Sequence, residues 1–280
     1  MPPYLYFVVS AVFHYLGPAL AVLLFARIDA LGVAWLRIAT AAVVLVAWRR
    51  PWHLRVTRVL VAWAVVLAAM NSVFYLAIDR LPLGTVAAIE FLPVVVLAAF
   101  AARTPRNLAA LAIAVAGVYL LTDVRLVTSP LGFVFAAANA VLFALYIVLS
   151  HRMAADAGID ALALAMLIAA ALALPFGVVQ AAPAFTDPLL LAAAAGVGVC
   201  SSVIPYVTDQ LAMARLPRAT YALMVSLLPA VATVIGVIVL AQLPSLPEVA
   251  GVALVVAGVA WHRPSPSPAP AEPHDADSPN

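Results

Sequence analysis

Long apolar runs separated by short polar turns make up most of this chain. We identify ten such runs, each close to the ~20 residues that an α-helix needs to cross a bilayer. They cover residues 4–25, 31–48, 59–78, 82–101, 107–122, 130–150, 159–180, 188–212, 218–241 and 246–262. The turns between them carry the Arg, Asp and Pro residues, as in Arg49-Arg50-Pro51 and Asp79-Arg80-Leu81-Pro82. The pattern predicts an all-α integral membrane protein with ten transmembrane helices.

Composition supports the membrane assignment and excludes several classes of function. Of the 280 residues, 67% are hydrophobic and 9% are charged, whereas about a quarter are charged in a soluble domain. The single cysteine, Cys200, excludes a disulfide framework and a cysteine-rich metal site. The sequence has no phosphate loop, no His/Cys cluster, no Gly-x-Ser-x-Gly motif and no basic stripe. We therefore expect no enzyme, no cofactor, no metal and no nucleic-acid partner.

The distribution of arginine predicts how the chain lies in the membrane. All fourteen basic residues are Arg. With a cytoplasmic N-terminus, the cytoplasmic side holds ten of them, Arg49, Arg50, Arg55, Arg58, Arg103, Arg106, Arg152, Arg215, Arg218 and Arg263, against Arg27, Arg80 and Arg125 outside. This bias places both termini in the cytoplasm. The first run lacks a basic leader and is read as a retained span, and the polar tail 264–280 is expected to be disordered.

Two halves of the chain resemble one another. LAIDRLPLGT at 76–85 returns as LAMARLPRAT at 211–220, and Pro93 and Pro229 interrupt the spans that follow. We therefore predict a five-helix repeat over 1–125 and a second over 126–263, inverted because five crossings reverse the direction of entry. Inverted repeats with interrupted helices are typical of secondary transporters, whose site lies near the midplane. A chance match among Ala/Val/Leu helices is the alternative, which the repeated Arg-Leu-Pro turn disfavours.

Glu90 is the main candidate for a functional group. It lies eight residues past Pro82, about 12 Å along a helix and so near the middle of a core about 30 Å thick. Burial favours the neutral acid and an approaching cation favours the carboxylate, and this opposition would couple a proton to a substrate amine. The alternative is a structural carboxyl group bonded to a neighbouring helix.

Two further ionisable residues lie inside predicted spans. His14 shares a helix face with Ser10 and Pro18, and it would either titrate in a proton pathway or bond a neighbouring helix. Arg37 would bind a substrate carboxylate, balance an acid, or extend to the membrane interface.

The remaining candidates are polar residues at helical spacing. Asp209 shares a face with Ser202 and Tyr206 and is either an inner gate or an interfacial charge. Asn71 with Tyr75, and Asn139 with Tyr146, are spaced to face one cavity each, or to bond neighbouring helices.

Several motifs resemble the EamA-type drug/metabolite transporters, and within them the threonine/homoserine exporter branch. The resemblance runs over about 4–261 and is specific at Met70-Asn71, Phe74-Tyr75, Pro82-Leu83-Gly84, Glu90-Phe91, Pro205-Tyr206 and Arg215-Leu216-Pro217. It implies ten helices in two inverted repeats, a central cavity, a bacterial inner-membrane location and export coupled to the proton gradient. The chain departs from the branch at Leu228, where a Glu is usual, and at Ala241-Gln242, where Gly-Glu is usual.

We therefore expect a secondary transporter that exports a small metabolite, an amino acid such as threonine or homoserine, in exchange for protons. Glu90 would carry the proton or hold the amine, and Arg37 would hold the carboxylate. His14, Asn71, Tyr75, Tyr146 and Tyr206 would line the cavity. Export of another metabolite or a drug-like cation is the alternative, and a membrane enzyme or a scaffold is a second one. The sequence leaves the substrate, the coupling ion, the direction and the oligomeric state open.

Overall fold

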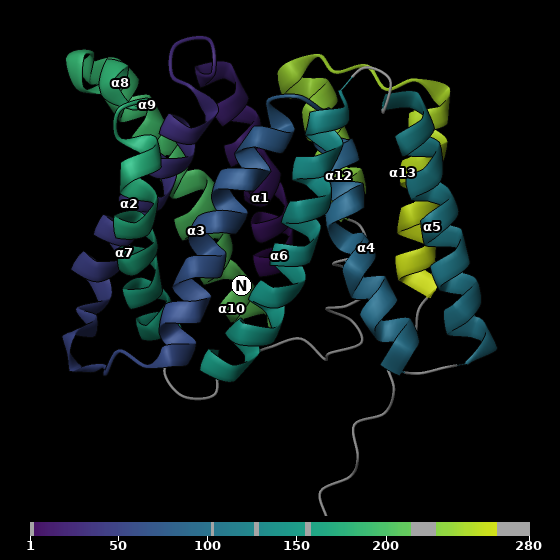
Figure 1. Cartoon of the computed structure of the whole chain (residues 1–280), viewed down its shortest axis with the longest axis horizontal. Helices are drawn as coiled ribbons and strands as arrows, with labels where there is room; N and C mark the ends of the chain where they lie inside the picture. Colours follow the sequence, from purple (N-terminus) through teal and green to yellow (C-terminus); the bar gives the residue numbers. More distant parts are fainter. Residues whose placement is uncertain (1–2, 102–103, 126–128, 155–157, 214–227, 262–280) are drawn as a thin grey trace, which may run out of the picture.

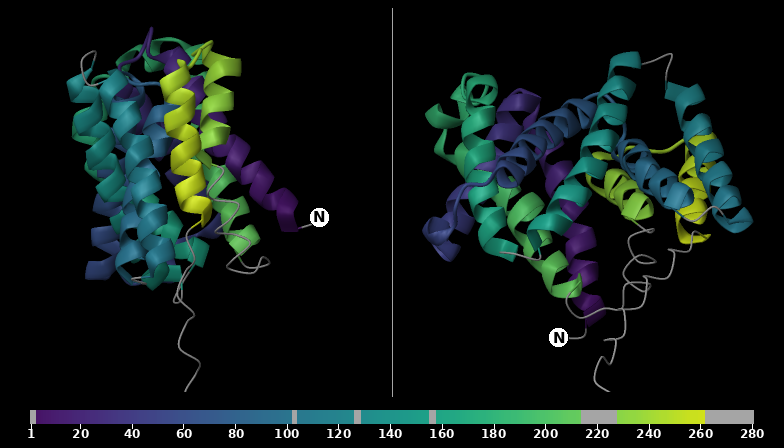
Figure 2. Two further views of the ribbon diagram at one scale, coloured as in Figure 1. Left: turned by 90° about the vertical axis from the view of Figure 1, so that its right-hand side faces the viewer. Right: turned by 60° about the horizontal axis from the view of Figure 1, so that its bottom comes forward.

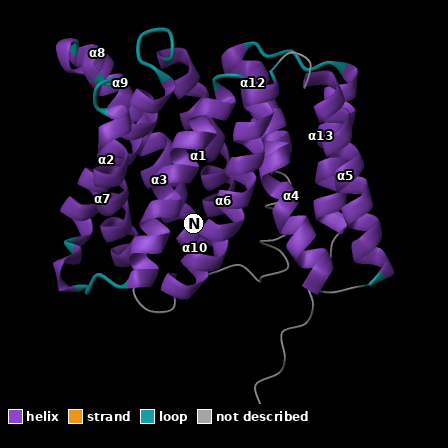
Figure 3. Ribbon diagram, viewed as in Figure 1, coloured by secondary structure: helices purple, strands orange, loops and turns teal. Residues whose placement is uncertain are grey.

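The computed structural model describes residues 3–101, 104–125, 129–154, 158–213 and 228–261. Over these residues the chain forms helices and connecting loops, with no strand (Figure 3). The long helices are α1 (Pro3–Leu24), α2 (Ala30–Arg49), α3 (Arg58–Ile78), α4 (Leu83–Ala101), α5 (Pro105–Arg125), α6 (Pro130–Ala154), α7 (Gly158–Gly177), α9 (Pro188–Gly198), α10 (Ile204–Met213), α12 (Leu228–Leu240) and α13 (Leu246–Trp261). The prediction of an all-α membrane protein is confirmed.

Six helical stretches are long and apolar enough to cross a membrane by length and composition. They are Leu5–Leu24, Ala30–Arg49, Arg58–Ile78, Pro130–Ser150, Gly158–Gly177 and Pro188–Thr208. Shorter apolar helices cover Leu83–Pro93, Leu228–Leu240 and Leu246–Gly258. The first part of the predicted ninth span and the tail 264–280 lie outside the described residues, so the count of ten stays a prediction.

Three short elements were not expected from the sequence. A 3-10 turn, η1 (Pro51–His53), follows α2, and α8 (Ala182–Thr186) lies between α7 and α9. The third, η2 (Val199–Val203), is a π-helical segment that joins α9 to α10 within one continuous span. The span predicted at 159–180 is also shorter in the structure, because α7 ends at Gly177, before the separate short helix α8.

The helices form a bundle with its connections at two ends (Figure 1). We call the end that carries α8 and the loops 25–29, 79–82 and 241–245 the top face. The opposite, bottom face carries the loop 50–57 and the end of α6. The two views of Figure 2 show that α5 and α13 lie at one edge of the bundle.

Helices from the two parts of the chain pack against each other in pairs. The pairs are α2 with α7, α3 with α6, α1 with α10, α4 with α12 and α5 with α13. Small residues permit some of these close approaches. A Cβ atom on Gly17 of α1 would overlap Ser201 of η2, and one on Gly84 of α4 would overlap Thr233 of α12.

Prolines inside the helices leave backbone carbonyls without their usual donor. A proline has no amide hydrogen for the carbonyl four residues earlier. Pro18 in α1 and Pro93 in α4 affect the carbonyls of His14 and Ile89 in this way. Pro205, near the start of α10, does the same for Ser201. Each interruption therefore lies beside a candidate functional residue.

Candidate functional site

Glu90 points into the bundle rather than toward lipid. Glu90 is 4% exposed, and its Oε1 accepts a 3.0 Å hydrogen bond from Nδ2 of Asn139 on α6. The other oxygen, Oε2, is buried without a hydrogen-bond partner among the described residues. A buried polar atom without a partner is costly, so this oxygen is suited to receive a proton or a cationic group.

Arg37 is also buried and is held by uncharged partners. At 5% exposure, it donates from Nε to Oγ of Ser202 and from Nη2 to the backbone carbonyl of Ser201, both at 2.8 Å. Its guanidinium lies over the ring of Tyr75, 5.4 Å from the centroid. No ion pair joins Arg37 to a carboxylate among the residues that the structure describes. The interfacial position considered for Arg37 is therefore wrong.

The backbone of the eighth span explains why Arg37 binds there. Pro205 cannot donate to the Ser201 carbonyl, and the π-helical turn of η2 shifts the bond of Ile204 to the carbonyl of Val199. The Ser201 carbonyl accepts a hydrogen bond from Arg37 on α2. The guanidinium therefore binds where the helix is interrupted inside the bundle.

Electrostatic interactions connect these groups into one site. The positive charge of Arg37 lies within electrostatic range of both Glu90 and His14. The carboxyl group of Glu90 lies within the same kind of range of the Tyr15 hydroxyl. His14 is half-buried, and its ring lies edge-on to Tyr15, with centroids 5.2 Å apart. The Tyr15 hydroxyl is buried with no hydrogen-bond partner in the described part of the chain. The site is thus built from α1, α2, α4, α6 and η2.

Tyr146 and Tyr206 belong to an aromatic cluster nearer the bottom face. The ring of Tyr146 stacks on Trp63 and on Phe143, each 6.2 Å between centroids, and lies 6.4 Å from that of Tyr206. Phe143 in turn meets Phe91, the neighbour of Glu90, at 5.6 Å. The cluster therefore extends from the residue beside Glu90 toward the bottom ends of α3 and α6.

Of two further expected site residues, one bonds within its own helix and the side chain of the other lies outside the described residues. Asn71 is buried and donates from Nδ2 to the carbonyl of Leu67 in its own helix, at 2.8 Å. Asp209 belongs to α10, but its side chain lies outside the described residues. Asn71 therefore contributes a hydrogen bond within α3, and in the described part of the chain it is not bonded to Glu90 or Arg37.

Sequence reasoning missed some partners of the site. The sequence predicts that Asn139 faces a cavity with Tyr146 or bonds a neighbouring helix, but it does not identify Glu90 as the partner. Tyr15, Ser201 and Ser202 were not considered as partners of Glu90 or Arg37. A signal for Ser201 was present, because Pro205 follows it by four residues. No comparable signal marks Asn139 as the partner of Glu90.

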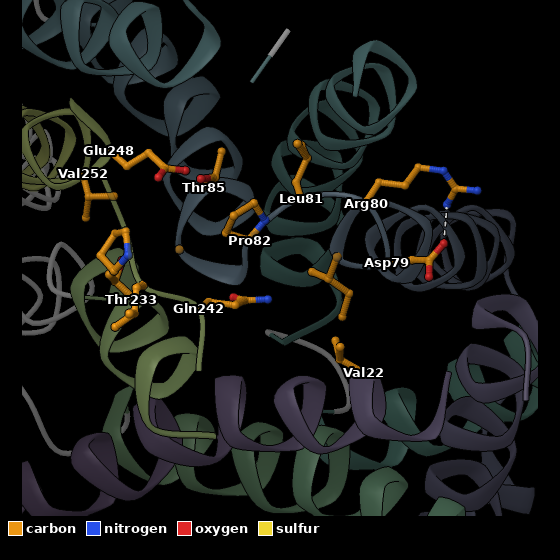
Figure 4. Close-up of a pocket in the computed structure, with 14 residues that line it drawn as sticks. Val22, Asp79, Arg80, Leu81, Pro82, Thr85, Thr233, Gln242, Glu248 and Val252 are labelled. Carbon is orange, nitrogen blue, oxygen red and sulfur yellow. Dashed lines mark hydrogen bonds and ion pairs between the residues drawn. The ribbon is translucent and has the colours of Figure 1, made fainter. Parts of the chain in front are cut away.

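Surface cavities occur at both faces. The top cavity has about 340 Å³ and lies between the turn 79–85 and the segment 242–248 (Figure 4). The bottom cavity has about 400 Å³ and is lined by residues 54–60, which cover the end of the loop before α3 and the first turn of α3, together with Arg152 and Met153. Within the described ranges, no group of three or more His, Cys, Asp or Glu residues is placed to hold a metal ion.

Known proteins resemble this chain in sequence and in fold. The model of the EamA-like transporter family matches residues 130–262. The threonine/homoserine exporter RhtA of Salmonella typhimurium strain LT2 is 34% identical over 233 residues, which are 81% of this chain and 79% of the relative. The RhtA of Escherichia coli K12 is 33% identical over the same shares.

A solved crystal structure has the same fold. It matches with a TM-score of 0.61 at 21% identity, over 91% of this chain and 95% of its own. The apolar helices and the exporter relatives support a multi-pass protein of the bacterial inner membrane. The chain belongs to the EamA-like transporter family and is related to the threonine/homoserine exporters.

Proposed function

We propose that this transporter exports a small amino acid of the threonine/homoserine class in exchange for protons. The observation that carries the proposal is the pair of buried, opposite charges at Glu90 and Arg37, which are not joined to each other. The names of the relatives supply the substrate class.

The two charges suit the two ends of an amino acid. Oε2 of Glu90 has no partner in the described structure and would accept hydrogen bonds from the ammonium group. Over the described residues Arg37 has only neutral partners, and guanidinium groups bind carboxylates strongly and with defined geometry. A drug-like cation would leave Arg37 without an anionic partner, so we favour the zwitterion.

Proton coupling follows from competition at Glu90. The same carboxylate oxygen would hold either a proton or the ammonium group, because both require the lone pairs of one buried oxygen. A proton arriving from outside would displace the substrate there, and a substrate arriving from inside would displace the proton. His14 and Tyr15 lie close to this exchange.

We propose that the fold is two inverted five-helix repeats over 1–125 and 126–263. The packing supports this, because α1 packs on α10 and α12 while its counterpart α6 packs on α3 and α4. The remaining pairs join counterparts directly, as α2 with α7 and α5 with α13. Alternating access would then come from one repeat moving against the other around the central site.

We propose that the bottom face is cytoplasmic and that both termini lie there. On the described residues, Arg49, Arg50, Arg55, Arg58, Arg106 and Arg152 are toward the bottom, whereas Arg27 and Arg80 are at the top. Arginine accumulates on the cytoplasmic side of membrane proteins. The top face would therefore open to the periplasm.

Transport in liposomes tests the proposal. Purified protein would be reconstituted, the vesicles loaded with labelled threonine, and an inward proton gradient imposed. We expect efflux above protein-free vesicles, accelerated by the pH step and competed by homoserine. Efflux of a labelled lipophilic cation without threonine efflux would replace this proposal with the drug-export alternative, and no transport of either would favour a scaffold.

A further inference from the structure

The bottom cavity lies where the loop before α3 meets the end of α6. Its lining combines Arg55 and Thr57 of the loop with Arg152 and Met153 of α6, and apolar side chains complete it. The helices α3 and α6 pack against each other. Two arginines that are far apart in the sequence therefore line one cavity.

The two arginines of the cavity have no acidic partner in the described structure. The carboxylate of Asp160, next to the lining residue Ala161, is already engaged, with its oxygens 2.6 Å from Nε of Arg49 and 3.5 Å from Nε2 of His53. Neither Arg55 nor Arg152 forms an ion pair with a described residue.

The sequence of the two segments that meet here is also unbalanced in charge. Residues 49–60 and 150–161 together hold five arginines and two aspartates. One of the aspartates, Asp156, lies outside the described residues, so the excess of positive charge remains even when Asp156 is counted. Basic pockets between membrane helices bind anionic headgroups, and an anion is the ligand that this cavity favours.

The polar groups of the cavity suit a phosphate. A guanidinium binds phosphate oxygens in a bidentate fashion, and here two guanidinium groups come from different helical segments. The hydroxyl of Thr57 accepts a 3.2 Å hydrogen bond from the amide of Leu60, which leaves its own hydrogen for a phosphate oxygen. The volume of about 400 Å³ has room for a glycerophosphate group.

An apolar stripe on α6 leads to Arg152 and indicates that the phosphate belongs to a lipid. Val141, Leu145 and Val148 are exposed and recur with Arg152 at helical spacing on one face. This face is opposite Asn139, which bonds Glu90 in the bundle interior. An acyl chain that lies along the stripe would bring its headgroup to Arg152.

Two exposed tryptophans place the same cavity at the membrane surface. Trp48, near the end of α2, and Trp52, in η1, are both exposed. Tryptophan is enriched where a membrane protein meets the lipid headgroups. The loop that carries Arg55 therefore lies at the depth of those headgroups.

We propose that the bottom cavity binds the phosphate headgroup of one anionic phospholipid, held between Arg55 and Arg152 with an acyl chain along α6. The inference goes beyond the proposed function and does not depend on it, because it concerns a lipid of the membrane and not the exported solute. The bound lipid would link the loop before α3 to the end of α6 and stabilise the contact between these helices.

A lipid titration of the full-length protein tests the site. Delipidated protein in detergent would be titrated with phosphatidylglycerol and with phosphatidylcholine of the same acyl chains, and the bound lipid would be counted by native mass spectrometry. We expect one phosphatidylglycerol to bind at least about tenfold more tightly than phosphatidylcholine, or about 1.4 kcal/mol. It should also raise the melting temperature. Glycerol 1-phosphate, which lacks acyl chains, should not displace it at equal concentration.

Matched variants separate the cavity from the general positive charge of this face. The double variant Arg55→Gln, Arg152→Gln should raise the Kd for phosphatidylglycerol about tenfold. The control Arg50→Gln, Arg58→Gln removes the same charge from the same face at residues outside the lining, and its Kd should change less than about twofold. All four arginines are exposed, so the lipid-free melting temperatures should match that of the parent. Arg152→Gln alone should shift the Kd in the same direction by a smaller factor.

Three results would overturn the inference. Equal losses of affinity in the two double variants would show general electrostatic attraction in place of a site. Equal affinity for phosphatidylcholine and phosphatidylglycerol would remove the argument from charge. Displacement of the lipid by equal concentrations of glycerol 1-phosphate or inorganic phosphate would assign the cavity to a soluble phosphate compound. Each of these results would leave the proposed export of threonine standing, because the titration contains no transported solute.

Discussion

The guanidinium of Arg37 donates a 2.8 Å hydrogen bond to the backbone carbonyl of Ser201, a carbonyl that Pro205 cannot serve. A charged side chain of α2 therefore binds the backbone of the eighth span at its π-helical segment. Because its partners in the described structure are neutral, the positive charge would be available to an anion. The same contact fixes the guanidinium and leaves its charge unneutralised.

Replacing Arg37 with lysine should separate charge from geometry. The ammonium of Lys keeps the charge but lacks the planar fork that contacts Ser201 and Ser202 together. We expect the threonine concentration for half-maximal efflux to rise about tenfold, or about 1.4 kcal/mol. Efflux from liposomes loaded over a range of threonine concentrations measures it. Arg49→Lys, at an exposed ion pair with Asp160, is the control, and equal kinetics in both variants would contradict a role in carboxylate binding.

The Glu90–Asn139 pair predicts two different defects. Glu90→Gln keeps an acceptor for Asn139 but cannot ionise, so the pH step should no longer accelerate threonine efflux. Asn139→Leu removes the donor that orients Oε1, so efflux should fall about tenfold while its dependence on pH remains, as expected for loss of about 1.4 kcal/mol. Rates measured at several imposed pH steps distinguish the two. Wild-type pH dependence in Glu90→Gln would remove the proposed mechanism.

The close approach of α1 to η2 predicts a strong response at Gly17. A methyl group there would overlap Ser201, so Gly17→Ala should lower the free energy of unfolding by about 1–3 kcal/mol. Gly196→Ala is the matched control, because that exposed helical glycine has nothing within 4 Å of an added Cβ. Alanine is the better helix former by about 1 kcal/mol, so this variant should be as stable as the parent or more stable. Denaturant titration in detergent compares both, and similar losses would refute the packing argument.

The end of α12 predicts a stabilising substitution. Ala241 has φ +52°, a left-handed conformation that costs a residue with a Cβ about 1–2 kcal/mol and that glycine adopts freely. Ala241→Gly should therefore raise the free energy of unfolding by up to about 1 kcal/mol, since the unfolded chain also gains freedom. Ala250→Gly, an exposed position inside α13, should lower it. A lower thermal midpoint for Ala241→Gly than for the parent would count against this conformation.

The cap at the start of α9 predicts a dependence of stability on pH. Hydrogen bonds from the backbone amides of Leu190 and Leu189, with the ion pair to Arg27, hold the pKa of Asp187 below its usual range. Because the pKa of Asp187 is lower in the folded protein than in the unfolded chain, its carboxylate stabilises the fold at pH values above the unfolded pKa. This stabilisation is lost as the pH falls through the pKa of the folded state. Asp187→Ala should lower the melting temperature at pH 7, and the difference from the parent should shrink below about pH 4. Arg27→Ala removes the ion pair and keeps the cap, so it separates the two contributions. A difference in melting temperature between Asp187→Ala and the parent that does not change with pH would contradict the role of the cap.

The sequence predicted the helices well because each apolar run is bounded by a strong turn signal. The second and third spans, expected at 31–48 and 59–78, form Ala30–Arg49 and Arg58–Ile78. The π-helical turn at Val199–Val203 could not be placed, because it depends on contacts of α9 and α10 with α1 and α2. The short helix α8 was missed because its five residues carry no periodicity.

The charged residues of the candidate site could be predicted from the sequence, but the hydrogen bonds between its residues could not. Glu90 and Arg37 are recognisable because an ionisable residue in an apolar run is unusual. That Glu90 bonds Asn139, and that Arg37 bonds Ser201, depends on how α4 meets α6 and how α2 meets η2. These are relations between distant segments, on which helical spacing within one segment carries no information.

Gln242 links the end of one half of the transporter to the start of a helix in the other. Its side-chain oxygen accepts a 3.1 Å hydrogen bond from the amide of Leu83, the first residue of α4. The loop after α12 and the helix that bears Glu90 are thereby tethered to each other. If the bundle opens at this end, the tether has to break or to travel with both partners, so under the proposed alternating access a movement at the top face would be passed to the helix that carries Glu90.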